Sequence, residues 1–160
     1  MMIVPPGNLR SSGVHFSPEQ AGRRWPTHRP TGGASTSPHK LRVMIVEDEL
    51  FVAMHLESVL EELGHEVTAV LSTGERALDE FPRLQPDIIM MDINLGDGID
   101  GITAAQQIRL SGDVQIVFVS AYSDAGTRAR VEAALPGSKL LSKPVTPGML
   151  MSAIQEDRRH

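Results

Sequence analysis

Residues 43–49 read VMIVEDE, and residues 88–92 read IIMMD. In both stretches four apolar residues run directly into acidic ones, which is typical of a short strand that is covered on both faces of a sheet. A third apolar run, residues 116–119, ends at Ser120. These runs predict parallel strands that carry polar side chains at their carboxyl ends.

Longer amphipathic stretches separate the apolar runs from residue 41 onward, which is the pattern of βα units. The first stretch is the clearest, because apolar residues recur at helical spacing from Val52 to Leu63 and Gly64 follows. We therefore predict an α/β fold with a five-stranded, doubly wound parallel sheet, flavodoxin-like and of the (βα)5 type, in a three-layer sandwich. The expected strands are 41–46, 66–71, 87–91, 114–119 and 139–141, and the expected helices are 50–63, 74–84, 101–111, 124–135 and 146–157.

The beginning of the chain differs from the rest in composition. Of residues 1–40, 19 are Pro, Gly, Ser or Thr, and the apolar residues among them follow no period. Such a stretch buries too little surface to offset its chain entropy. We expect residues 1–39 to be a disordered Pro/Gly/Ser-rich extension and residues 40–160 to be the folded domain.

Charge and cysteine content exclude several classes of protein. The chain has a net charge of −5, and residues 41–160 hold 10 basic and 19 acidic residues, which argues against a nucleic-acid binder. The absence of cysteine excludes a disulfide scaffold, a thiolate metal site and a cysteine nucleophile. No apolar run reaches the length of a membrane span. We expect a cytoplasmic protein without nucleic-acid or membrane partners.

Polar residues at the carboxyl ends of neighbouring strands would meet, because open α/β sheets bind their ligands there. Glu47, Asp48 and Asp92 would repel one another unless a cation lay among them, and clustered carboxylate oxygens suit Mg²⁺. A carboxylate beside Mg²⁺ can attack a phosphoryl group. Lys143 would then face the phosphoryl oxygens as a positive charge, and Ser120 would donate a hydrogen bond to them.

Simpler roles also fit some of these residues. Acids that follow a strand often cap a helix, as Glu47, Asp48 and Glu49 would, and Lys143 would also fit an exposed loop. Asp92 is harder to explain in this way, because it closes an unbroken apolar run where a charge is costly without a partner. The joint occurrence of these residues at strand ends favours a functional site.

Five stretches of the sequence follow one another in a recognisable order: VMIVEDE at 43–49, PDIIMMDINL at 86–95, DG at 100–101, VFVSA at 117–121 and SKP at 142–144. Through them, residues 41 to about 157 resemble the receiver domain of bacterial two-component response regulators. The resemblance implies that Asp92 accepts a phosphoryl group from a sensor histidine kinase or a histidine phosphotransfer protein, and that the domain assists its own phosphorylation and dephosphorylation without being an enzyme.

The resemblance also assigns the other site residues. Mg²⁺ would be bound by Asp48 directly, by Glu47 through water or more loosely, by Asp92, and by the backbone carbonyl of Asn94. The hydroxyl of Ser120 would move toward the phosphoryl group, and Lys143 would be its counter-charge. The Lys143–Pro144 bond would be cis, which a bond to proline permits.

The sequence departs from the family pattern at several positions. The segment 95–101 lacks the usual proline after Leu95 and is one residue longer than the commonest version, so we expect a loop more mobile than average, in which Gly96 and Gly98 are free to take positive φ. Glu47 stands where aspartate is commoner. Leu140 replaces the aromatic residue that many members use as a switch. Tyr122, two residues after Ser120, would border the path of water to the phosphoryl group and slow its hydrolysis.

Other functions fit less well. Three acids stand where a nucleotide-binding protein needs a glycine-rich loop, and Asn94 stands where a haloacid-dehalogenase-type phosphatase needs a second aspartate. Because the sequence ends after the last expected helix, we expect a stand-alone receiver whose output is phosphorylation-dependent protein binding, onward phosphotransfer or a phosphorylation-dependent homodimer. The alternative is a receiver-like interaction module that works without phosphorylation. His55 and His65 are expected to be solvated.

Overall fold

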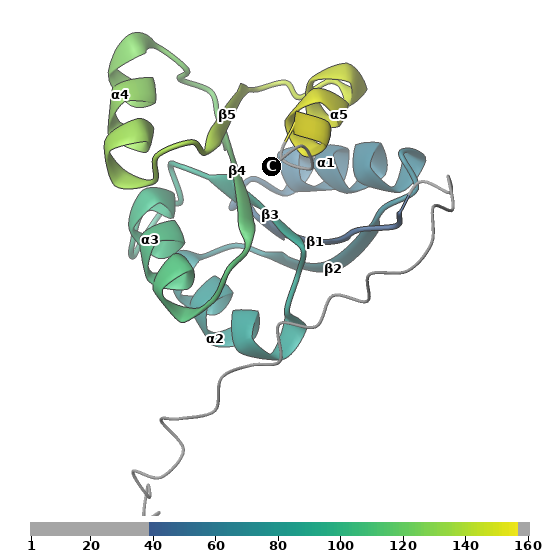
Figure 1. Ribbon diagram of the computed structural model, residues 1–160, viewed down its shortest axis with the longest axis horizontal. Coiled ribbons are helices and arrows are strands. Elements are labelled where there is room, and N and C mark those ends of the chain that lie inside the picture. Colours follow the sequence, from purple (N-terminus) through teal and green to yellow (C-terminus); the bar gives the residue numbers. More distant parts are fainter. Residues whose placement is uncertain (1–38, 157–160) are drawn as a thin grey trace, which may run out of the picture. The chain divides into compact units, whose positions relative to one another are not determined.

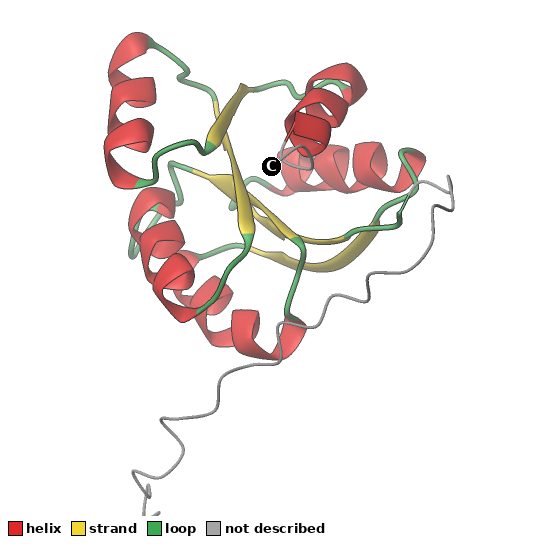
Figure 2. Cartoon of the chain, viewed as in Figure 1, coloured by secondary structure: helices red, strands yellow, loops and turns green. Residues whose placement is uncertain are grey.

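Five strands alternate with five helices in the computed structural model, which describes residues 39–156 (Figures 1 and 2). Every element lies within one residue of its predicted bounds, apart from residue 157, which lies outside the described part. The elements are β1 (Arg42–Val46), α1 (Leu50–Glu62), β2 (Glu66–Leu71), α2 (Gly74–Leu84), β3 (Ile88–Asp92), α3 (Gly101–Ser111), β4 (Gln115–Ser120), α4 (Ala125–Ala134), β5 (Lys139–Ser142) and α5 (Pro147–Glu156).

The strands form one parallel sheet in the order β2-β1-β3-β4-β5. The helices α1 and α5 cover one face of this sheet, and α2, α3 and α4 lie along the other (Figure 1). This is the predicted doubly wound, three-layer fold. The chain leaves β1 toward one edge and later turns toward the other, so the direction of winding reverses between β1 and β3. Ligand sites in such sheets lie beyond the carboxyl ends of the strands at this reversal.

The core has two parts because alternate side chains of the strands point to opposite faces of the sheet. Met44 and Met91 contribute to the part beneath α2 and α3, whereas Ile45 and Met90 contribute to the part beneath α1 and α5. All five residues of β3 are buried, which makes this strand the centre of the fold. A side chain at its carboxyl end is therefore held on a rigid support.

Side-chain caps fix the start of four helices. Each of α2, α3, α4 and α5 is preceded by a residue whose side chain accepts a hydrogen bond from a backbone amide of the first turn, and these residues are Thr73, Asp100, Asp124 and Thr146. Gly64 ends the first βα unit with a φ of +83°, a conformation that other residues rarely adopt. These local signals explain why the element bounds could be predicted so closely.

The predicted N-terminal extension lies outside the described residues except for its last position, so its disorder stays a prediction. Within residues 39–156, no helix has the length and apolar character needed to cross a membrane.

Candidate functional site

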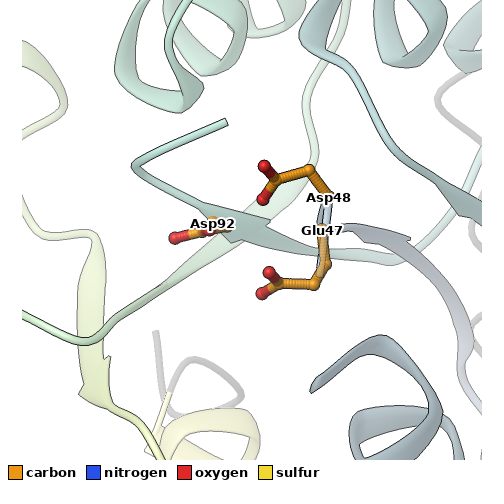
Figure 3. Close-up of side chains that lie close together, drawn as sticks. All are labelled: Glu47, Asp48 and Asp92. Atoms are coloured by element: carbon orange, nitrogen blue, oxygen red, sulfur yellow. The ribbon is translucent and has the colours of Figure 1, made fainter. Parts of the chain in front are cut away.

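Three carboxylates gather beyond the carboxyl ends of β1 and β3 (Figure 3). One oxygen each of Glu47, Asp48 and Asp92 lies within 4.8 Å of the others. Lys143, which follows β5, places its Nζ 2.8 Å from Glu47 Oε2 and 3.1 Å from Asp92 Oδ2. The four residues that the sequence placed at strand ends are thus brought together at the reversal of the sheet.

Two of these acids are deeply buried. Glu47 and Asp92 are each only 3% exposed, because Asp92 ends the fully buried β3 and Glu47 continues the line of β1, with its backbone amide bonded to the carbonyl of Leu71. A buried carboxylate is costly unless a positive charge faces it. The ammonium group of Lys143 is that charge, and its side chain is 11% exposed.

The electrostatics keep Lys143 charged and leave the acids in excess. Burial raises the pKa of Glu47, and the charge of Asp92 raises it further, against the opposing effect of the hydrogen bond from Lys143. Burial by itself would lower the pKa of Lys143, but the bonds and charges of Glu47 and Asp92 outweigh it and raise that pKa. The single ammonium group of Lys143 therefore contacts two carboxylates, those of Glu47 and Asp92, and the carboxylate of Asp48 lies beside them.

The site fits a further cation such as Mg²⁺. Both carboxylate oxygens of the buried Glu47 lie near Lys143 Nζ, Oε2 at 2.8 Å and Oε1 at 3.0 Å, and Oε2 accepts no aligned hydrogen bond. Together with oxygens of Asp48 and Asp92, this carboxylate forms a set of hard ligands that carry negative charge. Asp48 is exposed, which gives an ion a way in from solvent.

Ser120, Tyr122 and Asn94 lie around Asp92 with different contacts. Ser120 ends β4, is fully buried and accepts a hydrogen bond from the Tyr122 amide at 3.1 Å, whereas the Tyr122 side chain is exposed. The backbone amide of Asn94 donates a hydrogen bond to Asp92 Oδ1 at 3.2 Å. Among the described residues, no hydrogen bond joins the side chain of Ser120 or Tyr122 to Asp92.

The longer loop between β3 and α3 is bonded to the site. The amide of Gly96 donates to Asp48 Oδ2 at 3.2 Å. Of the two glycines that are free to take positive φ in this loop, Gly98 does so, with a φ of +106°, and Gly96 does not. The Lys143–Pro144 bond is cis, as the resemblance implied.

Some contacts at the site had no clear sign in the sequence. Glu49, first regarded as a helix cap, makes no capping bond and instead places Oε1 3.5 Å from Lys143 Nζ. His55 is exposed, as expected, yet its Nε2 lies 2.8 Å from the carbonyl oxygen of Val145 and so joins α1 to the segment after Lys143. This contact spans 90 residues of sequence and has no motif that would reveal it.

Gly101 also belongs to the surroundings of Asp92. A Cβ at this position would overlap the carbonyl oxygen of Asp92, so only glycine allows α3 to begin so close to β3. The available signal was the pair Asp100-Gly101, where a cap residue is followed by a glycine at the first helical position.

Known proteins with similar sequences were compared with the chain. The family model described as "Response regulator receiver domain" matches residues 43–155. The chain is 33% identical over 116 residues to the phyllosphere-induced regulator PhyR of Methylorubrum extorquens, covering 71% of this chain and 42% of that protein. It is 32% identical over 118 residues to the chemotaxis protein CheY of Thermotoga maritima, covering 72% of this chain and 95% of that protein.

Solved structures give the same result. The signal receiver domain of a modulated diguanylate cyclase from Desulfovibrio desulfuricans is similar with a TM-score of 0.67 and 33% identity, covering 74% of this chain and 93% of that one. The receiver domain of PhyR from Erythrobacter litoralis has a TM-score of 0.64 and 28% identity, covering 73% of this chain and 88% of that one. With its fold, its site and these similarities taken together, the chain belongs to the response regulator receiver domain family.

Proposed function

We propose that the chain is a phosphoacceptor in two-component signalling, and that Asp92 takes a phosphoryl group from the histidine of a sensor kinase or a histidine phosphotransfer protein. The observation that carries this proposal is the buried Asp92 carboxylate with Lys143 Nζ 3.1 Å from its Oδ2 and further acids beside it. Membership of the receiver family supports the same role.

In the proposed transfer, an oxygen of Asp92 bonds to phosphorus while the phosphorus–nitrogen bond of the phosphohistidine breaks. The electron pair of that bond remains on the histidine ring. Lys143 is placed to neutralise a phosphoryl oxygen, because it already contacts Asp92, and the Ser120 hydroxyl is the neighbouring donor. Balancing the charge of the phosphoryl oxygens is the main task of a protein in such a transfer.

Mg²⁺ is the cofactor that the acids suit. Asp48, Glu47 and Asp92 would hold it, and the backbone carbonyl of Asn94 would complete the set. When bound, the ion supplies positive charge that reduces the repulsion between the Asp92 carboxylate and the incoming phosphoryl group. This role agrees with the excess of acid over base at the site.

The proposed output is a change in protein binding that follows phosphorylation, or onward transfer of the phosphoryl group to another protein. A phosphorylation-dependent homodimer is a third form of the same output. The alternative, an interaction module that works without phosphorylation, is less favoured because the three acids and Lys143 are all present, with the acids clustered and Lys143 in contact with Glu47 and Asp92.

Tyr122 is proposed to modulate the lifetime of the phosphorylated state. Its backbone is bonded to Ser120, and its side chain is 67% exposed at the edge of the site. A ring held there would hinder water on its in-line path to the aspartyl phosphate.

Labelling with acetyl phosphate in the presence of Mg²⁺ tests the phosphoacceptor. We expect a single phosphoryl group per chain by intact mass, and no labelling of Asp92→Asn, which keeps the shape of the side chain but loses the nucleophilic carboxylate. Asp113→Asn is the control, since the Asp113 side chain is almost fully exposed and forms an ion pair with Arg109, away from the acidic cluster. Undiminished labelling of Asp92→Asn would overturn the proposal.

A further inference from the structure

We propose that Glu75, in the first turn of α2, is a positioning residue for the metal site. It holds the loop between β3 and α3, residues 93–100, at the place where the Gly96 amide contacts the Asp48 carboxylate. The inference rests on the proposed function insofar as Asp48 is taken to be a metal ligand. Glu75 itself lies outside the acidic cluster and would bind no ion.

Glu75 is bonded directly to the loop. Its Oε1 accepts a hydrogen bond from the amide of Ile99 at 2.8 Å, across 24 residues of sequence. That bond holds the pKa of Glu75 below its usual range, so the ionised carboxylate is the form that binds the loop. A charged acceptor makes a stronger hydrogen bond than a neutral one.

Two glycines, Gly98 and Gly74, leave space for the hydrogen bond between Glu75 and the Ile99 amide. A Cβ at Gly98 would lie 2.8 Å from Glu75 Oε2 and closer still to Oε1, so only glycine lets the carboxylate approach the loop here. A Cβ at Gly74 would lie 2.7 Å from Cγ1 of Ile99. The side chain of Ile99 is packed against the core beneath α2 and α3. Backbone and side chain of Ile99 are thus both fixed against the start of α2.

The other end of the same loop reaches the acidic cluster. The Gly96 amide donates to Asp48 Oδ2 at 3.2 Å, only three residues before Ile99. Asp48 is the exposed member of the cluster, and within residues 39–156 no other hydrogen bond or ion pair holds its carboxylate. A backbone amide that donates to one carboxylate oxygen orients the carboxylate toward the metal. Loss of a hydrogen bond of this kind typically lowers the metal affinity about 10- to 100-fold.

The effect of Glu75 on the metal should be smaller, because it acts through the loop. Removal of its carboxylate frees Ile99 and lets Gly96 leave Asp48 for part of the time. We therefore expect the Kd for Mg²⁺ to rise about 3- to 10-fold in Glu75→Ala, below the range for direct loss of a supporting bond.

Isothermal titration with MgCl₂ and NMR spectra of the metal-free protein test this. Glu75→Ala should weaken Mg²⁺ binding as stated and shift the amide signals of Gly96 and Ile99 before metal is added. Glu75→Gln keeps an oxygen acceptor and should restore most of the affinity. Asp79→Ala is the matched control, because it removes an exposed carboxylate from the same helix and should leave the Kd unchanged.

The outcomes separate this inference from the proposed function. If Asp48→Ala abolishes Mg²⁺ binding while Glu75→Ala binds as tightly as the wild type, the positioning role is refuted and the metal site stands. If Mg²⁺ binding is weakened equally in Glu75→Ala and Asp79→Ala, the loss of one negative charge explains the change, and the positioning role is also refuted. If Asp48→Ala binds Mg²⁺ as tightly as the wild type, Asp48 is not a ligand and both this inference and the proposed metal site are overturned, whereas the phosphoacceptor role of Asp92 is tested separately by labelling.

Discussion

Replacement of Gly101 by alanine should destabilise the domain, although alanine is the better helix former. The new Cβ would overlap the carbonyl oxygen of Asp92, and it would lie 2.8 Å from the carbonyl carbon, where ordinary contacts begin at 3.4 Å. Relief requires α3 to move away from β3, against the hydrogen bond from the Gly101 amide to the carbonyl of Ile93 at 3.0 Å. Overpacking by one methyl group costs about 1–3 kcal/mol, and a clash with backbone belongs at the upper end.

Alanine regains about 1 kcal/mol through its helix propensity, so the net loss for Gly101→Ala is about 2 kcal/mol. Gly148 provides the control, because it lies in the first turn of α5 and a Cβ there meets nothing within 4 Å. Gly148→Ala should therefore gain up to about 1 kcal/mol. The two variants make the same chemical change in the first turn of a helix, at its first residue in α3 and its second in α5, and their stabilities should move in opposite directions.

Urea unfolding followed by far-UV circular dichroism measures both changes. With a slope near 2 kcal/mol per molar, typical of a small domain, Gly101→Ala should lower the midpoint by about 1 M, and Gly148→Ala should raise it by up to about 0.5 M. The slope itself should not change. A midpoint for Gly101→Ala at or above that of the wild type would refute the close approach of α3 to Asp92.

Three further predictions address pH, metal and the lifetime of the phosphorylated state. Hydrogen bonds from backbone amides hold the pKa values of Glu75 and Asp124 below their usual range, so the stability that these carboxylates contribute is present above about pH 4.5 and is lost as the pH falls. Glu75→Gln should therefore lose less stability on acidification than the wild type, and equal losses in melting curves would contradict this. Asp48→Ala should weaken Mg²⁺ binding more than Glu47→Ala in a calorimetric titration, because the family resemblance makes Asp48 the direct ligand; equal losses would argue against that ranking. Phosphate should leave phosphorylated Tyr122→Ala several-fold faster than the wild type, measured as loss of label, and an unchanged or slower rate would remove the proposed role of the ring.

The elements of the fold could be predicted because their signals are local. The apolar runs of β1, β3 and β4 mark buried strands, and a cap residue or a glycine stands at most helix ends. The candidate site could be predicted for a related reason. Once the strands are known to be parallel, topology alone brings their carboxyl ends together, and the polar residues at those ends must meet.

Contacts between loops and helix surfaces could not be predicted in this way. The bond from Ile99 to Glu75 and the contact of His55 with Val145 depend on how loops and helices of different βα units lie against each other. Neither contact has a fixed spacing, and exposed acids and histidines are common on helices without partners. The loop glycines have the same limit, since composition leaves Gly96 and Gly98 free to take positive φ but does not say which of them does so, and only Gly98 does.

The arrangement of charge around Lys143 explains why its place after β5 matters to the fold as well as to the proposed chemistry. Glu47 and Asp92 are buried at the ends of neighbouring strands, and each would oppose folding if left without a cation. Lys143 directly follows β5, which lies two strands beyond β3 in the sheet, and it contacts both acids. Its ion pairs therefore link the carboxyl ends of β1, β3 and β5. A group that draws Lys143 toward itself, as a phosphoryl group on Asp92 would, must therefore alter the restraint on β5. The half-buried β5 lies at the edge of the sheet, and it is the strand best placed to respond.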